Sequence, residues 1–156
     1  MSGAVASDSG GQPAGERPTY AIPSLPWGCS PQDARTNLAR GTTTTVGALT
    51  AAGVLPFEST SSGFRVFGEA HFAWGVLTHV RTTCIREDDD AVEAPVFFGD
   101  ISGFFLSLHG LNEPVPPFVD GKMVRQWPSD ERGSLRMTLD MESGEIVILC
   151  HSGTAA

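Results

Sequence analysis

Hydrophobic and polar residues alternate most clearly toward the carboxyl end of the chain. Leu135, Met137, Leu139 and Met141 fall on one face of an extended segment, and Arg136, Thr138, Asp140 and Glu142 fall on the other. A period of two is typical of a strand that buries one side. Ser143-Gly144 then signals a tight turn, and the β-branched run Ile146–Ile148 follows it. The pattern predicts a β-hairpin that packs one side on a core.

Earlier segments also have the pattern of strands. Phe64–Phe67, Phe72–Ile85 and Pro95–Gly99 are rich in aromatic and β-branched residues. The long second segment is expected to place Trp74, Val76, Thr78 and Val80 on one face and Leu77, His79 and Arg81 on the other, so we expect Trp74 to lie in the core. The β-branched run within Thr42–Leu49 predicts another strand, with a polar loop as the alternative.

Helix is expected at one place only. Ser30-Pro31-Gln32-Asp33 combines a serine N-cap, a proline at the first helical position and an acid in the first turn. This helix is short and ends by Gly41. Before it, Tyr20–Trp27 alternates prolines with bulky apolar residues, which favours an edge segment laid against the core.

The chain divides into a tail and one domain. Residues 1–19 are rich in Gly, Ser, Ala and Pro and hold almost no large apolar residue, so we expect a flexible tail. Residues 20–156 are long enough to form a single domain with a sizeable core. Scattered Gly and Pro, nine Phe and many Val, Thr and Ser indicate an all-β composition.

The formal net charge of −8 bears on partners. Nucleic acid is an unfavourable partner, because binding a polyanion relies on Lys and Arg, of which the chain has ten. The four adjacent carboxylates of Glu87–Asp90 repel one another and predict a solvated loop. Such a loop can steer a basic partner, so the expected partner is a protein or peptide, with a basic one favoured. Asn112–Pro117 holds three prolines and predicts a second long loop.

Cysteine usage and the amino terminus indicate the compartment. Cys29, Cys84 and Cys150 show no metal-ligand spacing and suit buried thiols in a reducing environment, without a structural disulfide. The first 15 residues lack the basic and apolar regions of a secretory signal, and no apolar run is long enough to cross a membrane. We therefore expect an intracellular protein, cytoplasmic or nuclear.

The sequence holds none of the familiar catalytic motifs. The nucleophile elbow, the Walker A loop, the dinucleotide fingerprint and the zinc-protease helix are missing from the sequence. The four histidines are spread over four segments, and four successive acids do not provide the alternating ligands of a calcium loop. Cys84 beside Arg86 lacks a neighbouring base. We expect no catalytic residues, no metal and no cofactor.

Four segments follow one another in a distinctive order. They are Phe72–Val76, Gly103–Gly110, Asp120-Gly121-Lys122 through Trp127-Pro128, and Leu135–Asp140 before a short turn. Together they resemble the SPRY family of concanavalin-like β-sandwiches, in which they are similar, in that order, to a central strand, an aromatic strand, a connecting strand and loop, and a strand that precedes a short turn. The resemblance covers roughly residues 64–150. It implies an antiparallel β-sandwich with little helix and non-catalytic recognition of a peptide or protein loop.

Loops at one end of such a sandwich are the expected binding surface, and the chain is expected to act as a stand-alone adaptor, a competitor or a structural subunit. The candidate partner-binding residues are Glu87, Asp88, Asp89, Asp90, Asn112, Phe118, Arg125 and Trp127. Two alternatives stay open. One is a carbohydrate-binding or hydrolytic jelly-roll domain, since the architecture hosts lectins and glycosidases. The other is an oligomeric, particle-forming subunit that pairs through an unclosed sheet edge.

Overall fold

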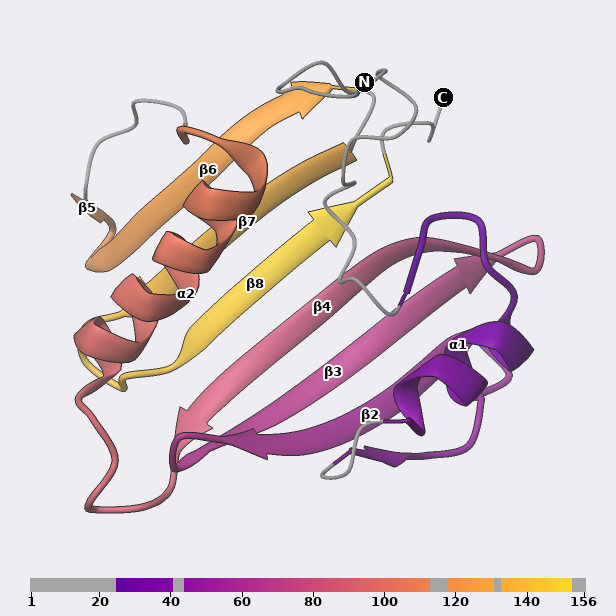
Figure 1. Ribbon diagram of the computed structural model, residues 1–156, viewed down its shortest axis with the longest axis horizontal. Helices are drawn as coiled ribbons and strands as arrows, with labels where there is room; N and C mark the ends of the chain where they lie inside the picture. The colour runs from indigo at the N-terminus through magenta and orange to yellow at the C-terminus, as the bar shows by residue number, and fades with distance from the viewer. Residues whose placement is uncertain (1–24, 41–43, 113–117, 131–132, 153–156) are drawn as a thin grey trace, which may run out of the picture.

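The computed structural model describes residues 25–40, 44–112, 118–130 and 133–152 of the 156-residue chain (Figure 1). The expected flexible tail, residues 1–19, lies outside the described residues, as do residues 113–117 of the predicted proline-rich loop. Among the described helices, none is long and apolar enough to cross a membrane.

One antiparallel sheet of eight strands runs through the described chain, in the order β1-β2-β3-β4-β8-β7-β6-β5 (Figure 1). The strands are β1 (Thr45–Val46), β2 (Val54–Ser61), β3 (Phe64–Ala73), β4 (Val76–Arg86), β5 (Phe118–Val119), β6 (Lys122–Asp130), β7 (Gly133–Asp140) and β8 (Ile146–His151). The prediction of a mainly antiparallel β structure is confirmed.

Two helices, α1 (Pro31–Leu38) and α2 (Ala94–His109), cover the same face of this sheet (Figure 1). The described residues form one sheet with helices against this face, so the β-sandwich is not confirmed. The second layer is helical because its apolar residues recur with a helical period. The other face of the sheet is not covered by any described element, and we call it the open face.

The predicted N-terminal helix is confirmed. In α1 the Ser30 hydroxyl oxygen accepts a hydrogen bond from the Asp33 backbone N–H at 3.1 Å, and Pro31 occupies the first turn. Ala34 and Leu38, four residues apart, turn toward the sheet and are buried.

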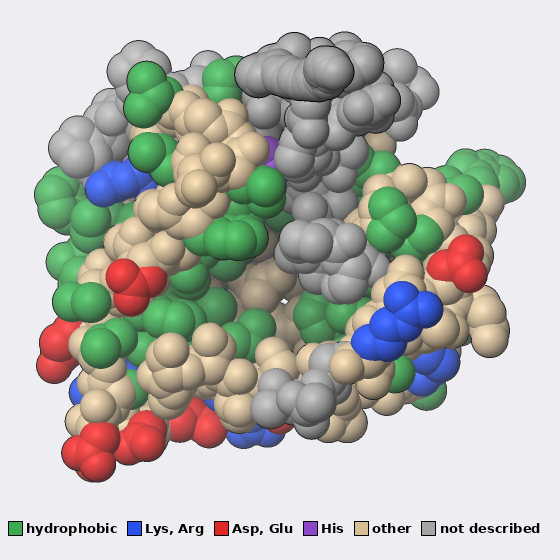
Figure 2. All heavy atoms as spheres, viewed as in Figure 1, with side chains coloured by type: hydrophobic (Ala, Val, Ile, Leu, Met, Phe, Trp, Pro, Cys, Tyr) green, Lys and Arg blue, Asp and Glu red, His purple; other side chains and the backbone are tan. Residues whose placement is uncertain are grey.

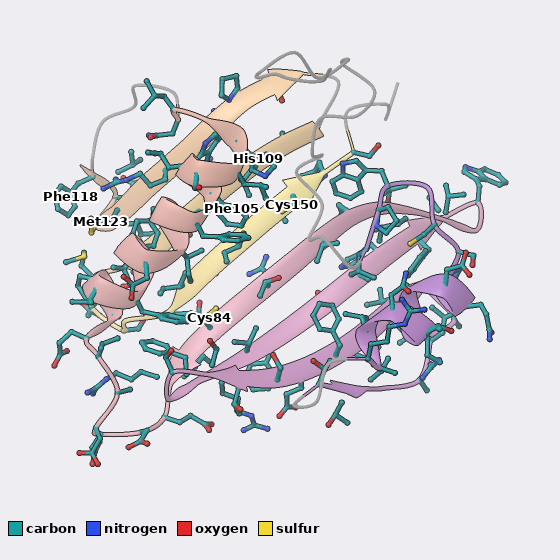
Figure 3. All side chains as sticks on the ribbon, viewed as in Figure 1. Cys84, Phe105, His109, Phe118, Met123 and Cys150 are labelled. Carbon is teal, nitrogen blue, oxygen red and sulfur yellow. The ribbon has the colours of Figure 1, made fainter. Side chains whose placement is uncertain are left out.

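The prediction of strands at Pro95–Gly99 and Gly103–Gly110 is wrong, because both segments belong to α2. The buried residues of this helix are Ala94, Phe97, Phe98, Phe105 and His109, and Ile101 is partly buried. Their spacing of three, four and seven residues places them on one face of a helix. Figure 3 shows Phe105 and His109 projecting from α2 toward the sheet, where Cys150 lies.

The predicted C-terminal hairpin is confirmed. Strand β7 pairs with β8, with Met137 opposite Ile148, and the turn contains Ser143-Gly144. Leu135, Met137 and Leu139 are all almost fully buried on the helix side. Met141 lies beyond the strand and is exposed.

The prediction of one long strand over Phe72–Ile85 is wrong. The chain reverses at Trp74-Gly75, so that β3 and β4 form a hairpin with a register shift at His71/Phe72. Both turn residues have positive φ, 56° at Trp74 and 79° at Gly75. Trp74 therefore lies at the tip of a hairpin and not in the core, where the alternating pattern had placed it.

The chain contains the same order of elements twice. A helix followed by four strands makes the N-terminal half (α1 to β4), and the same order makes the C-terminal half (α2 to β8). The halves join where β4 pairs with β8, and each half has its own group of buried residues on the helix side.

In the N-terminal half, Phe57 lies across Gly68, where an added Cβ would meet the Phe57 ring. A side chain at position 68 is therefore excluded by packing.

Candidate recognition surfaces

The acidic segment Glu87–Asp90 is a loop built on the β2–β3 turn. The backbone N–H groups of Glu87 and Asp88 both donate to the Gly63 carbonyl, at 3.1 Å and 3.2 Å. Gly63 has φ of 82°, and a Cβ there would meet Ala91, so the close approach of the two segments needs glycine. The prediction of a solvated loop is confirmed, because all four acidic side chains are exposed.

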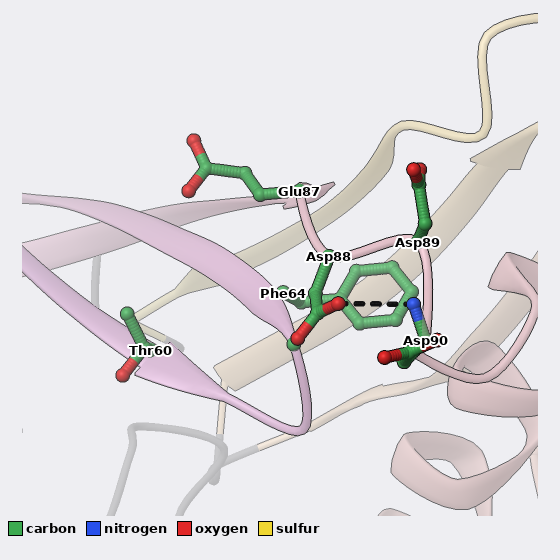
Figure 4. Close-up of a pocket in the computed structure, with 7 residues that line it drawn as sticks. Thr60, Phe64, Glu87, Asp88, Asp89 and Asp90 are labelled. Carbon is green, nitrogen blue, oxygen red and sulfur yellow. Dashed lines mark hydrogen bonds between the residues drawn. The ribbon is translucent and has the colours of Figure 1, made fainter.

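The Arg86 side chain holds this loop by hydrogen bonds to the backbone of the loop. Its guanidinium donates to the carbonyl oxygens of Asp89 at 2.9 Å, Ala91 at 2.6 Å and Val92 at 3.2 Å. The Asp88 carboxylate accepts the Asp90 N–H at 2.9 Å (Figure 4). The positive charge nearest in sequence therefore orders the loop without forming an ion pair with the carboxylates of Asp88, Asp89 or Asp90.

A hollow of about 730 Å³ lies between this loop and the β2–β3 turn (Figure 4). Its lining comprises Thr60, Gly63, Phe64, Glu87, Asp88, Asp89 and Asp90. Phe64 is buried and its ring stacks on Phe97 of α2, with 4.0 Å between ring centroids. Glu87 is engaged by Arg65, which also pairs with Glu58. The three aspartates provide the unneutralised charge of the hollow.

Further acids lie at the same end of the sheet. The turns β5–β6 and β7–β8 meet there, since the Met141 N–H donates to the Gly121 carbonyl at 3.3 Å. The acidic residues of this end are Glu87, Asp88, Asp89, Asp90, Glu93, Asp120, Asp140, Glu142 and Glu145. Figure 2 shows red side chains gathered along the lower left of the molecule, where these loops lie. We call this region the acidic end.

The other candidate residues from the sequence do not join the acidic loop. Asn112 follows the far end of α2, and Phe118 lies in edge strand β5, with 56% of its surface exposed. Arg125 belongs to the helix side of β6, where its guanidinium lies 5.6 Å from the centroid of the Phe98 ring. The expected single surface is thus divided among separate places.

The expectation that Trp127 is an exposed anchor is wrong. Its side chain is 1% exposed under α2, with its ring edge toward Phe105. The indole N–H donates to the Gly110 carbonyl at 2.9 Å, just after the helix ends. Trp127 faces inward because it shares the helix-side row with Leu135 of β7. It is a core residue.

Sequence reasoning missed Trp74, which is fully exposed at the tip of the β3–β4 hairpin. Neighbouring Val76 and nearby Leu49 of the β1–β2 loop are 41% and 44% exposed. The segments 47–53 and 72–77 hold no charged residue, and hydrophobic side chains form the right-hand end of the molecule in Figure 2. Gly75 between two strand-like runs was a partial signal of a hairpin turn, although Trp-Gly is not one of the preferred turn pairs such as Asn-Gly or Asp-Gly. We call this region the apolar tip.

The cysteines and acids form no reactive centre in the described chain. Burial raises the pKa of the Cys84 thiol to about 11 and that of Cys150 to about 12, so neither is a ready thiolate. Burial and the Asp33 carboxylate also raise the pKa of Cys29. Among the described residues no group of three or more His, Cys, Asp or Glu is arranged to hold a metal ion.

Comparison of the chain with protein-family models, with curated proteins and with solved structures found no match.

Proposed function

We propose that the protein is a non-catalytic recognition module whose acidic loop, Glu87–Asp90, captures a basic segment of a protein or peptide. The observation that carries the proposal is the set of hydrogen bonds made by Arg86. Its guanidinium donates to three backbone carbonyl oxygens, so it orders the loop without forming an ion pair with the carboxylates of Asp88, Asp89 or Asp90. A preordered loop loses less entropy on binding, and unpaired carboxylates attract lysine and arginine side chains.

This role agrees with what the SPRY resemblance implies, namely recognition by loops at one end of a β structure. The family assignment stays a prediction, and so does the β-sandwich, of which the described residues supply one sheet. The proposal does not depend on either, because it rests on the loop, the hollow and their charge.

A binding assay with defined peptides tests the acidic end. The probe is a fluorescent lysine-rich peptide of about ten residues, with a glutamine-for-lysine peptide as its uncharged counterpart. We expect the lysine peptide to bind with an affinity that falls as salt is added, and the glutamine peptide not to bind. Fluorescence anisotropy at several salt concentrations measures both.

Matched variants separate the site from general acidity. Combined Asp88→Asn, Asp89→Asn and Asp90→Asn keeps the side-chain acceptors and removes three charges, and Asp120→Asn, Glu142→Gln and Glu145→Gln removes three charges elsewhere at the same end. The first variant should weaken binding by about tenfold relative to the second. Equal loss in both variants, or no binding by the wild type, would show that the loop is not the site.

A second contact is favoured by Trp74. Exposed aromatic anchors dominate the energetics of protein interfaces, and this indole has no packing role in the described chain. Crosslinking in a lysate of the source organism, compared between wild type, Trp74→Ala and the exposed-aromatic control Phe118→Ala, tests it. One protein should be lost with Trp74→Ala and retained with Phe118→Ala. Identical crosslinked proteins in all three samples would remove Trp74 from the proposal.

The two alternatives have their own tests. A carbohydrate-binding sheet needs aromatic side chains along its open face, and apart from histidines the described open face offers Phe67, which lies under the Arg65 guanidinium. A glycan array tests this alternative. Edge-to-edge assembly would use β1 or β5, each two residues long, and light scattering tests it.

A further inference from the structure

Three histidines lie side by side on the open face of the sheet. His71 of β3 pairs with His79 of β4, and His79 pairs with His151 of β8. Their rings stack, with centroids 4.0 Å apart for His71 and His79 and 4.9 Å apart for His79 and His151. We call them the histidine stack. Their strand neighbours Ala70, Val80 and Cys150 are buried on the helix side, which places all three rings on the side facing away from the viewer in Figure 1.

The next row of the same face carries two arginines. Arg81 of β4 and Arg136 of β7 both pair with Leu149 of β8, one from each side. The Cα atoms of the two arginines are therefore about 10 Å apart. Both are exposed, and in the described part of the chain neither forms an ion pair. Glu69 is the one described acid in these two rows, and its carboxylate lies 3.3 Å from His71 Nε2. The face thus gathers five groups able to carry positive charge in a chain of net charge −8.

A hollow of about 450 Å³ opens beside this row, where β6 departs from regular pairing between Trp127 and Asp130. Arg136, His151, Ser129 and Ser134 contribute to its lining, together with Gln126, Trp127, Pro128, Leu135 and Leu149. This size falls within the range of small-molecule sites. Its guanidinium, imidazole and hydroxyl groups are the donors that proteins use to hold oxyanions.

Protonation of His79, the central ring of the stack, is opposed by its surroundings. Burial lowers the pKa of His79, and the neighbouring His71 and His151 lower it further, while Glu69 acts in the opposite direction. An anion placed against the stack would compensate this repulsion. Since coupling between two binding events is reciprocal, a proton bound at the stack strengthens anion binding, and a bound anion favours the proton.

We propose that the hollow on the open face binds a small molecule through a phosphate-type oxyanion, held by Arg136 and His151, with His79 and Arg81 beside it. The planar guanidinium suits bidentate contact with tetrahedral oxyanions, and Ser134 pairs directly with His151 in the sheet, so its hydroxyl borders the same space. The site lies on another face from the acidic end, and neither proposal depends on the other.

Titration with sulfate tests the site, because the charge of sulfate does not change in the range where histidines titrate. Binding is followed by calorimetry and by the imidazole NMR signals. We expect sulfate to bind at least about fivefold more tightly at about pH 5 than at about pH 8, since the charge of a histidine side chain generally changes within this range. Inorganic phosphate should compete with sulfate, and acetate should compete poorly. Acetate competing equally well would overturn the assignment to a tetrahedral oxyanion.

Variants locate the site. Arg136→Gln should weaken sulfate binding by about tenfold or more, since it removes a charge-assisted hydrogen bond. His151→Gln should weaken binding at low pH and flatten its pH dependence. The matched control Arg65→Gln, on the same face but already paired with Glu58 and Glu87, should bind as wild type does. No binding at either pH, or equal loss in Arg136→Gln and Arg65→Gln, would overturn the proposal.

Discussion

The two halves of the molecule each end in a hairpin, and the two hairpin turns are built differently. In the C-terminal half, the Asp140 carboxylate accepts backbone N–H groups of Glu142 at 2.9 Å and Ser143 at 3.2 Å. In the N-terminal half, the corresponding β3–β4 turn presents Trp74, fully exposed and in a left-handed conformation that bulky side chains rarely adopt. One turn residue is explained by local hydrogen bonding, and the other is not.

Asp140 thus has a clear role in folding, whereas no contact in the described chain explains Trp74. Asn or Gly at position 74 would relieve the backbone, and the described chain gains no contact from an indole that points into solvent. Strained backbone conformations that no packing contact compensates are found often at functional sites. The C-terminal turn is therefore explained by its own hydrogen bonds, and the exposure of Trp74 supports the proposed second contact at the apolar tip.

The largest expected effect compares the two tryptophans. Trp127→Ala should lower the free energy of unfolding by about 3–5 kcal/mol, because it empties a core site and removes the indole hydrogen bond to Gly110. Trp74→Ala should change it by less than about 0.5 kcal/mol. Urea denaturation measures both values. Similar losses of unfolding free energy in the two variants would show that Trp74 contributes to the stability of the fold, contrary to the difference drawn between the two tryptophans.

A smaller effect of opposite sign is expected for Trp74→Asn. Asparagine followed by Gly75 is the preferred pair for a turn with two positive φ values, so stability should rise by about 1 kcal/mol. Thermal and urea unfolding measure the change. A destabilised Trp74→Asn protein would indicate that the indole supports the hairpin after all.

The Asp140 turn should respond to acid. The backbone hydrogen bonds from Ser143 and Glu142 hold the pKa of Asp140 below its usual 3.8, so its contribution to stability is full above that value. The contribution is lost as pH falls through the lowered folded pKa. Asp140→Asn keeps an acceptor but cannot titrate, so its melting temperature should fall less than that of the wild type below about pH 4. Parallel melting curves would contradict this cause.

The smallest expected effect concerns the histidine stack. The folded state lowers the pKa of His79 below its usual 6.5. Between the two pKa values, the unfolded chain therefore binds a proton at His79 more readily than the folded chain does. Stability should therefore fall as pH drops from 6.5 toward the folded pKa. His79→Gln should lose less stability than the wild type between about pH 7 and about pH 5. Equal losses, measured in sulfate-free buffer, would show that His79 is not responsible.

Local patterns predicted the elements that depend on local chemistry. The capping serine and Pro31 located α1, the alternation of Leu135 to Leu139 located β7, and four adjacent carboxylates located a solvated loop. Strands and helix were confused at α2, because two short phenylalanine runs fit either structure until the spacing from Ala94 to His109 is read as a whole. Trp74 was misplaced because Phe72–Ile85 was interpreted as one uninterrupted strand, whereas the two-residue turn pairs Ala73 with Val76 and so inverts the alternation after it.

The sequence by itself determined a mainly antiparallel β structure, one capped helix and an exposed acidic loop, because each follows from interactions among residues close in the chain. Only the tertiary structure decided that helices form the second layer, that Trp127 is buried while Trp74 is exposed, and that three distant histidines stack. Those outcomes depend on strand pairing between segments far apart in sequence. One reversal of the chain at Trp74-Gly75 sets which side chains become neighbours across the strands that follow.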